Sequence, residues 1–234
     1  MSKIYTVVAA GGLGTRLQNY RNTNKTKMLL EVNGVAMITK QINQLISWNL
    51  DNFIIVTNPT FDNLIKDEIS RNIPNVNVQF CIQHEQLGVA HALLQAEQII
   101  EDGSKILYIL GDNFFELNPL LNIENLDKVN SVFLKEIKNP ENFGVVEISE
   151  NKIKSIEEKP KFPKSKLIAV GLYLFDSNCF EYIKNIEKSS RGEYEITSLI
   201  DIYLEKKDIG FSHVDGWWVD AGTPEAIEKI EKLI

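Results

Sequence analysis

Cysteine is scarce in this sequence, in which only Cys81 and Cys179 occur among 234 residues. Both lie in apolar stretches, and their separation does not resemble the spacing of a metal-binding pair. We therefore predict two buried thiols and a reducing compartment, with a disulfide between them as the alternative.

Long apolar runs are also absent. No stretch approaches the ~18 residues that a membrane-spanning helix needs. The N-terminal Met1-Ser2-Lys3 leads directly into a predicted strand instead of a signal peptide. The sequence therefore predicts a cytoplasmic protein that does not bind membranes.

Positive charge is in deficit, since 25 Lys and Arg residues face 32 Asp and Glu residues and the formal net charge is −7. A general nucleic-acid-binding surface is usually basic, so this balance argues against nucleic acid as a partner. An acidic protein that handles phosphates has to concentrate its positive charge in a local site.

Strand and helix patterns alternate through the first half of the chain. Strands are predicted at 4–10, 52–57, 76–82 and 106–110, and helices at 36–48, 61–69 and 89–100. Such alternation predicts an α/β, Rossmann-like fold with a mixed, mainly parallel sheet and helices on both faces. Ligands bind such sheets at the carboxyl ends of the strands. The segments expected along that edge are 11–16, 83–88 and 111–113.

The pattern changes after Lys128. Strands are predicted at 131–134, 144–148, 153–156 and 167–175, with helices at 178–186 and 196–204. A strand pair near 210–214 and 217–219 leads to a last helix at 224–234. We predict one domain over 1–234 in two halves, 1–128 and 129–234, the second forming a small β-rich lobe over the site.

A glycine-rich loop, Gly11-Gly12-Leu13-Gly14, follows the first predicted strand. Its glycines let backbone N–H groups converge on an anion, and Arg16 and Lys27 add full positive charges. A dinucleotide fingerprint requires a third glycine at the position of Leu17, and this loop does not have it. The loop also lacks the Gly-Lys-Ser/Thr of a Walker A loop. It predicts a phosphate-binding loop of another kind, with an ordinary turn as the alternative.

Two acids follow apolar strands. Asp112 comes directly after the predicted strand at 106–110, and Asp220 follows Trp218-Val219. Hard carboxylate oxygens at strand ends suit Mg²⁺, which usually takes few protein ligands together with phosphate oxygens. We predict a shared metal site, the alternative being that Asp112 caps a turn and Asp220 caps the last helix.

Other polar residues have weaker local patterns. Glu158-Lys159 ends a strand in the second lobe, and Arg191 lies in a loop before a helix; each also fits a solvated surface. Gln83 offers a donor and an acceptor that suit the imide edge of a pyrimidine, and Gly88 lets backbone approach a flat base. An exposed polar side chain is the alternative for Gln83.

Taken together, eight motifs occur in the order seen in sugar-1-phosphate nucleotidylyltransferases, and the chain most resembles short glucose-1-phosphate thymidylyltransferases. The resemblance runs from about Ile4 to the last helix. The motifs are Gly11-Gly12-Leu13-Gly14-Thr15-Arg16-Leu17, Lys27, Gln83 with Leu87-Gly88, Gly111-Asp112-Asn113, Phe143-Gly144-Val145-Val146, Glu157-Glu158-Lys159-Pro160, Arg191-Gly192-Glu193 with Glu195-Ile196-Thr197, and Val219-Asp220-Ala221-Gly222-Thr223.

The resemblance implies a nucleotide-diphospho-sugar transferase fold of the GT-A-like kind, with nucleotide bound by the first half and sugar phosphate by the second. It also implies residue roles. The nucleotide would be held by Gly11, Gly12, Gly14, Thr15, Arg16, Gln83 and Gly88. Catalytic charges would come from Arg16, Lys27 and Lys159, and Mg²⁺ ligands from Asp112 and Asp220. The sugar phosphate would be held by Gly144, Glu158, Lys159 and Arg191.

The implied reaction joins a nucleoside triphosphate to a sugar 1-phosphate and releases an NDP-sugar and pyrophosphate. The motif at Gln86-Leu87-Gly88 with Ala90-His91-Ala92 is more similar to uridylyltransferases, so dTTP or UTP is favoured as donor. A homo-oligomer is compatible with the resemblance. The alternatives are a cytidylyltransferase acting on a sugar or non-sugar phosphate and a catalytically silent, nucleotide-sensing relative.

Overall fold

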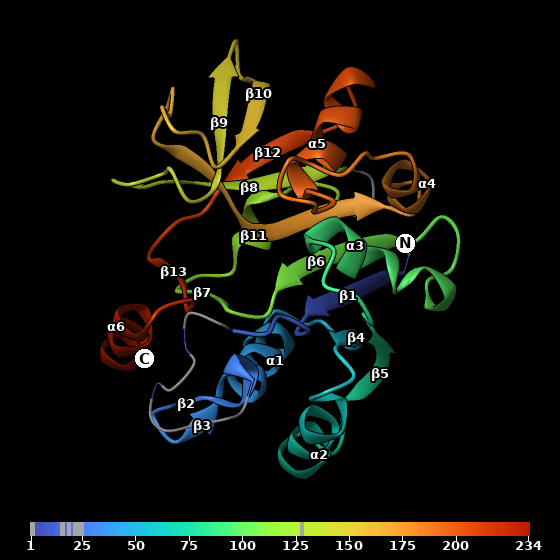
Figure 1. Ribbon diagram of the computed structural model, residues 1–234, viewed down its shortest axis with the longest axis vertical. Helices are drawn as coiled ribbons and strands as arrows, with labels where there is room; N and C mark the ends of the chain where they lie inside the picture. The colour runs from blue at the N-terminus through green and yellow to red at the C-terminus, as the bar shows by residue number, and fades with distance from the viewer. Residues whose placement is uncertain (1–2, 15–16, 18–19, 21–25, 127–128) are drawn as a thin grey trace.

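The computed structural model describes residues 3–14, 17, 20, 26–126 and 129–234. Four parallel strands form one side of its main sheet, in the order β6 (Lys105–Leu110), β1 (Ile4–Ala9), β4 (Asn52–Thr57) and β5 (Asn77–Ile82), with β5 at the edge. The long strand β11 (Leu167–Asp176) joins this group antiparallel to β6. The predicted mixed, mainly parallel sheet is confirmed (Figure 1).

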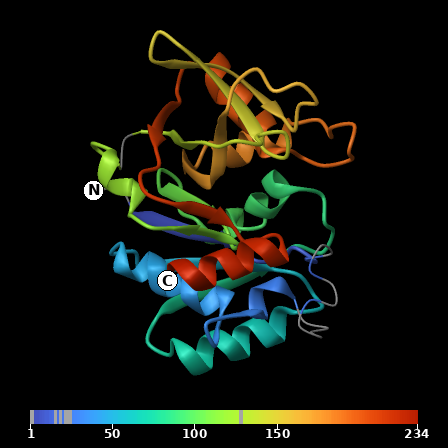
Figure 2. The ribbon, with the colours of Figure 1, turned by 90° about the vertical axis from the view of Figure 1, so that its left-hand side faces the viewer.

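The second half of the chain extends the sheet beyond β11. Strand β11 pairs with β9 (Gly144–Ser149), which forms a hairpin with β10 (Lys152–Glu158). It also pairs with β8 (Ser131–Glu136), which is parallel to β12 (Gly210–His213). In Figure 2 this β-rich region lies at the top, and α2 (Asp62–Asn72) lies at the bottom. The expected β-rich lobe is thus an extension of the central sheet.

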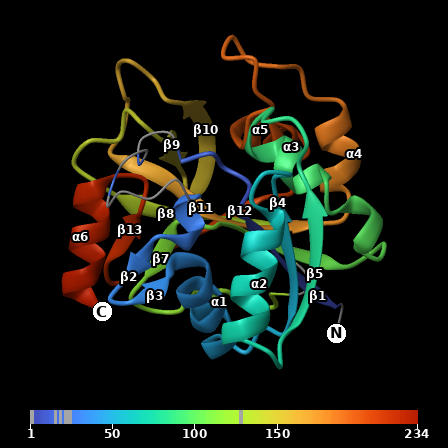
Figure 3. The same cartoon turned by 60° about the horizontal axis from the view of Figure 1, so that its bottom comes forward.

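The sheet is covered on both faces because neighbouring residues of a strand point to opposite sides. Val7 packs in one core cluster with α3 (Val89–Leu94), α4 (Cys179–Lys184) and α5 (Ile196–Glu205). Val8 packs in the other with α1 (Met37–Ser47) and α2. Figure 3 shows α1 and α2 side by side on the same face. These buried faces explain why the parallel strands are continuous apolar runs.

A third, smaller layer lies beside the main sheet. Strand β7 (Asn113–Phe115) pairs antiparallel with β13 (Trp218–Asp220), and β2 (Glu31–Val32) pairs with β3 (Val35–Ala36). Helix α6 (Pro224–Leu233) buries Ile227 and Ile230 against these short ribbons. This layer joins the C-terminal segment to the first half of the chain.

The structure corrects two sequence-based expectations. The segments near 210–214 and 217–219 do not pair with each other, because β12 pairs with β8 and β13 pairs with β7. The predicted helix at 89–100 ends at Leu94 and continues as a 3-10 turn, Glu97–Ile99, a common way for a helix to tighten at its end. Residues Lys27–Leu29 and Pro119–Asn122 also form short 3-10 turns.

The two cysteines are free thiols, as predicted, and burial raises the pKa of Cys81 to about 12. In the described part of the chain, the helices are all too short or too polar to cross a bilayer.

Candidate active site

A cavity of about 660 Å³ opens at the carboxyl ends of the parallel strands. Both halves of the chain contribute to its wall. The sequence-predicted residues that line it are Gly11, Gly12, Lys27, Gln83, Gly88, Asp112, Gly144, Glu158, Lys159 and Asp220. Ten positions from seven separate segments therefore meet around one space.

Lys27 and Asp112 form a buried ion pair on one side of this cavity. Lys27 begins the 3-10 turn Lys27–Leu29, which Thr26 caps by accepting from the Met28 N–H at 3.4 Å. The Lys27 Nζ hydrogen-bonds Asp112 Oδ2, and the two side chains are only 17% and 8% exposed. The turn therefore directs the ammonium group across the cavity floor onto the end of β6.

The glycine-rich loop makes room for this lysine. A Cβ on Gly14 would lie 3.1 Å from the Lys27 Cβ, and Gly14 has φ +61°, which disfavours other residues. A Cβ on Gly12 would lie 3.7 Å from the Lys27 Cε. The glycines thus have a packing function in addition to the anion-binding role expected of them.

Two opposing effects act on the Asp112 carboxyl. Burial raises its pKa. The Lys27 charge and the hydrogen bonds from Lys27 and Asn113 lower the pKa by more than burial raises it, so the pKa lies below the ordinary 3.8. Asp112 is therefore ionised at neutral pH.

Asp220 lies beside Asp112 because β13 pairs with β7. Asp220 is the register partner of Asn113, and the Ala221 N–H donates to the Asp112 carbonyl at 2.7 Å. Helix α6 is capped by Thr223, whose Oγ1 accepts from the Ala226 N–H at 3.3 Å. The two carboxylates thus line the same cavity from adjacent strands, and Asp220 is not the helix cap.

This donor set suits a divalent cation that binds oxygen. No group of three or more His, Cys, Asp or Glu side chains arranged to bind a metal occurs among the described residues. Two carboxylates with room for phosphate oxygens match the usual protein contribution to Mg²⁺. The Lys27 ammonium resting on Asp112 shows that the position favours positive charge.

Asn113 holds this corner together and was not among the predicted site residues. Its Oδ1 accepts from the Trp218 Nε1–H at 2.8 Å and from the Gly171 N–H at 3.0 Å, while its Nδ2 donates to Asp112 Oδ1 at 3.0 Å. One buried amide therefore joins β7, β13 and β11. Only its position after Asp112 could have suggested this role.

The second predicted wall carries a looser cluster of charges. Glu158 Oε1 lies 3.5 Å from the Lys159 Nζ and 3.4 Å from the Arg191 Nη1. Arg191 also contacts Glu193 at 2.5 Å and Glu195 at 3.4 Å. Burial raises the pKa of the Glu158 carboxyl above the ordinary 4.5, and the Glu195 charge adds to this, whereas Lys159 and Arg191 oppose it. Arg191 contacts Glu158 but does not line the cavity.

Two glycines of the site are required by close packing. Gly88 has φ +103°, and a Cβ there would lie 2.7 Å from the Tyr194 carbonyl oxygen. A Cβ on Gly144 would lie 2.9 Å from Thr197 Cγ2. Both glycines therefore let the loop and strand approach the segment that begins α5.

Gln83 is 3% exposed and lies at the base of the cavity. Its Nε2 donates to the Gly88 carbonyl at 3.1 Å and lies 3.0 Å from His91 Nδ1. His91 stacks on Tyr194 with ring centroids 6.0 Å apart. The exposed-surface alternative for Gln83 is thus excluded. Thr15 and Arg16, also predicted to bind nucleotide, lie outside the described residues.

Comparison with known proteins agrees with this geometry. A family model described as nucleotidyl transferase matches residues 5–234. Glucose-1-phosphate thymidylyltransferase of Neisseria meningitidis serogroup A is 32% identical, over 97% of this chain and 81% of that protein. UTP–glucose-1-phosphate uridylyltransferase AglF of Haloferax volcanii is 31% identical, over 97% of this chain and 95% of that protein.

Solved structures give the same result. A Bacillus anthracis chain described as a glucose-1-phosphate thymidylyltransferase, in complex with sucrose, superposes with a TM-score of 0.88 at 32% identity, covering 98% of this chain and 94% of that one. A UDP-glucose pyrophosphorylase complexed with UDP-glucose shares the fold, with a TM-score of 0.85 at 20% identity. With the family model spanning almost the entire sequence, the chain belongs to the nucleotidyl transferase family and is a nucleotidyltransferase.

Proposed function

We propose that this nucleotidyltransferase uses UTP or dTTP as donor and a sugar 1-phosphate as acceptor, and releases an NDP-sugar and pyrophosphate. The convergence of Lys27, the Asp112–Asp220 pair and Lys159 on one cavity carries the proposal. The thymidylyltransferase and uridylyltransferase relatives support these two donors and glucose 1-phosphate as the first acceptor to test.

The chemical obstacle is the repulsion between two anions. A phosphate oxygen of the sugar phosphate is already ionised, so the reaction needs no general base. That oxygen attacks the α-phosphorus in line, the new P–O bond forms, and the bond to pyrophosphate breaks on the opposite side. Lys27 and Lys159 neutralise the charges and orient the reactants. We propose the same role for Arg16.

The two halves of the chain would share the substrates. Gly11, Gly12, Gly14 and Thr15 would bind the triphosphate. Gln83 and Gly88 would bind the base, and Gly144, Glu158 and Lys159 would bind the sugar phosphate. Arg191 would act on this last group through Glu158, because it contacts that carboxylate but does not line the cavity.

Mg²⁺ is the divalent cation we propose, with Asp112 and Asp220 as the residues that would hold it. When bound, it would neutralise phosphate charge beside the lysines. The Asp112 carboxylate also keeps the Lys27 ammonium in position.

A substrate panel tests the proposal. Pyrophosphate release is measured for UTP, dTTP and CTP, each with glucose 1-phosphate or N-acetylglucosamine 1-phosphate, with Mg²⁺ and with chelator. We expect release with UTP or dTTP that depends on both the acceptor and the metal. Release from CTP alone, or in the presence of chelator, would contradict the donor or the metal assignment.

A further inference from the structure

The amide of Gln83 has a fixed orientation in this structure. Its nitrogen lies 3.1 Å from the Gly88 carbonyl oxygen, which can only accept, so this atom is a donor. The same nitrogen lies 3.0 Å from His91 Nδ1. Both N–H bonds of the amide are therefore used inside the protein, and His91 Nδ1 has to be the unprotonated ring nitrogen.

The amide oxygen faces the other way. Gln83 Oε1 lies 3.5 Å from where a Cβ of Gly11 would stand, at the cavity wall. Among the described residues, no group donates a hydrogen bond to this oxygen. A ligand in the cavity therefore meets an acceptor at this position and no donor.

We propose that His91 is a positioning residue that selects the nucleobase by holding the Gln83 amide in this orientation. The inference rests on the proposed function and deepens it. A base whose ring nitrogen carries a hydrogen, such as uracil or thymine, would donate to Oε1. A base whose ring nitrogen bears a lone pair there, such as cytosine, would meet lone-pair repulsion. A site with a fixed hydrogen-bonding partner discriminates strongly against the analogue that cannot pair with it.

The orientation depends on the protonation state of His91. A protonated ring has N–H on both nitrogens, so Nδ1–H would face the Gln83 N–H₂ group. Protonation would therefore remove one of the two contacts that hold the amide nitrogen, and only the Gly88 carbonyl would still favour the observed orientation. Burial lowers the pKa of His91 below the ordinary 6.5, and Lys188 acts in the same direction, while the Glu85 charge and backbone carbonyl oppose it. The neutral ring that the orientation needs is thus the main form at neutral pH.

Three residues surround the His91 ring or its stacking partner: Tyr194, Lys188 and Gln95. Tyr194 stacks on one face, and Lys188 lies over the Tyr194 ring with Nζ 5.4 Å from its centroid. Gln95 Nε2 lies 3.3 Å from His91 Nε2. Glu85 and Lys188 are the ionised groups of the described residues that shift its titration.

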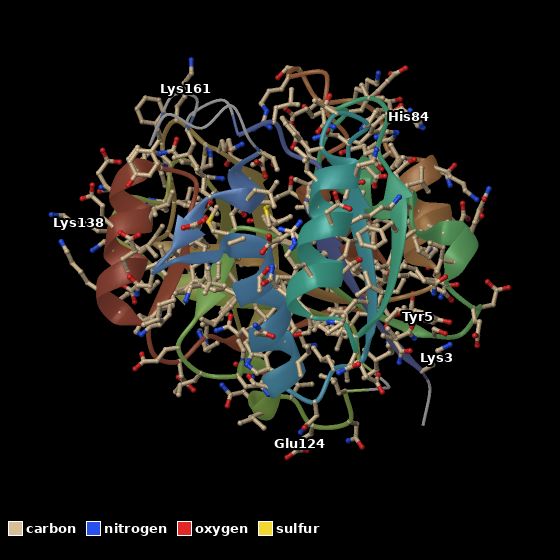
Figure 4. The ribbon with its side chains drawn as sticks, turned by 90° about the horizontal axis from the view of Figure 1, so that it is seen from below. Lys3, Tyr5, His84, Glu124, Lys138 and Lys161 are labelled. Atoms are coloured by element: carbon tan, nitrogen blue, oxygen red, sulfur yellow. The ribbon has the colours of Figure 1, made fainter. Side chains whose placement is uncertain are left out.

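The experiment compares UTP and CTP affinities by calorimetry, without acceptor, from pH 5.5 to pH 8. His91→Phe keeps a ring against Tyr194 but removes the acceptor, and His91→Asn supplies an acceptor oxygen that does not titrate. His84→Phe, at the exposed position next to Gln83, is the matched control (Figure 4). Thermal melting checks that each variant is folded.

We expect the wild-type protein to prefer UTP at pH 8 and to lose part of that preference at acid pH. His91→Phe should lower the preference at pH 8 about three- to tenfold, the value of one net hydrogen bond, and remove its pH dependence. His91→Asn should restore the preference without the pH dependence, and His84→Phe should behave as wild type.

An unchanged UTP preference and pH profile in His91→Phe would overturn the inference. Restoration by His91→Asn is a result that a purely structural role for the ring does not predict. If selective binding responds as expected but no triphosphate yields pyrophosphate with any acceptor, the proposed function fails and the inference stands.

Discussion

The two lysine–carboxylate pairs that line the cavity differ in how they are built. The Lys27–Asp112 pair is buried, its partners hydrogen-bond directly, and glycines and Asn113 fix its geometry. The Lys159–Glu158 pair is 3.5 Å apart, and its lysine is 43% exposed. One wall therefore holds its charges in a buried, direct pair, and the other shares them among several partners.

Burial affects the two carboxyl groups in opposite net directions. At Asp112 the paired lysine outweighs burial and the pKa falls, whereas at Glu158 burial outweighs Lys159 and Arg191 and the pKa rises. Proximity of a lysine therefore does not by itself make a strong ion pair. The strength of the pair depends on direct contact and on exclusion of water.

This contrast suits the proposed reaction. The triphosphate and its cation require fixed charges, because preorganised groups cost no reorganisation when the reaction occurs. The acceptor side has to admit a sugar, so a cluster in which Arg191 and Lys159 share Glu158 can exchange partners on binding. Three variants test this comparison.

Lys27→Ala should have the largest effect. It removes a fixed charge beside the reacting phosphates, so kcat/KM should fall by about 10²–10³-fold. It also leaves the buried Asp112 carboxylate unpaired, so the free energy of unfolding should fall by about 3 kcal/mol, near the lower end for a broken buried pair because water in the cavity reaches the carboxylate. Steady-state kinetics and urea unfolding measure the two effects.

The matched control is Lys3→Ala. Lys3 pairs with Glu101 at 3.0 Å at the surface, and Figure 4 places it at the lower right-hand margin of the molecule. Its loss should leave kcat/KM unchanged. A Lys27 variant that keeps full activity would remove the electrostatic basis of the mechanism.

Lys159→Ala should separate activity from stability. The KM for the sugar 1-phosphate should rise about 10–100-fold, because a charge that binds its phosphate is lost. The free energy of unfolding should change by no more than about 1 kcal/mol, as expected for a partly exposed ion pair. Kinetics with varied acceptor and urea unfolding at neutral pH check both statements. A stability loss equal to that of Lys27→Ala would show that the two walls are not different in kind.

Much of the fold was predictable from local patterns. The apolar runs ending at Ala10 and Leu110 identify buried parallel strands, and the rule that ligands bind at their carboxyl ends brings Gly11 and Asp112 together. The pairing of β7 with β13 was not predictable, because three-residue strands have too little periodicity to reveal a partner about 100 residues away. Asp220 was predicted as a metal ligand, although β7, the strand with which its own strand pairs, was not predicted.

The site was predictable as a set of residues but not as a set of contacts. Gly88 was predicted to let the backbone approach a nucleobase. Its positive φ and the nearby Tyr194 carbonyl already require glycine at this position. His91 was assigned no role, because its contact with Gln83 Nε2 depends on how the loop folds back onto α3. Residue type and spacing identify candidates, but hydrogen-bond direction appears only when tertiary structure is known.

Glu158→Gln should have the smallest effect of the three variants, a small gain in the free energy of unfolding at pH 8. The raised pKa of Glu158 means that the folded protein favours the protonated acid. Its contribution to stability is therefore complete below the ordinary 4.5 and is lost as pH rises through the folded-state pKa. The neutral amide resembles the protonated acid, so the variant should be more stable than wild type at pH 8, by less than about 1 kcal/mol, and equal to it at pH 4. Urea unfolding at the two pH values measures the difference. A variant less stable than wild type at pH 8 would mean that Lys159 and Arg191 outweigh burial, and that both walls are held by their ion pairs.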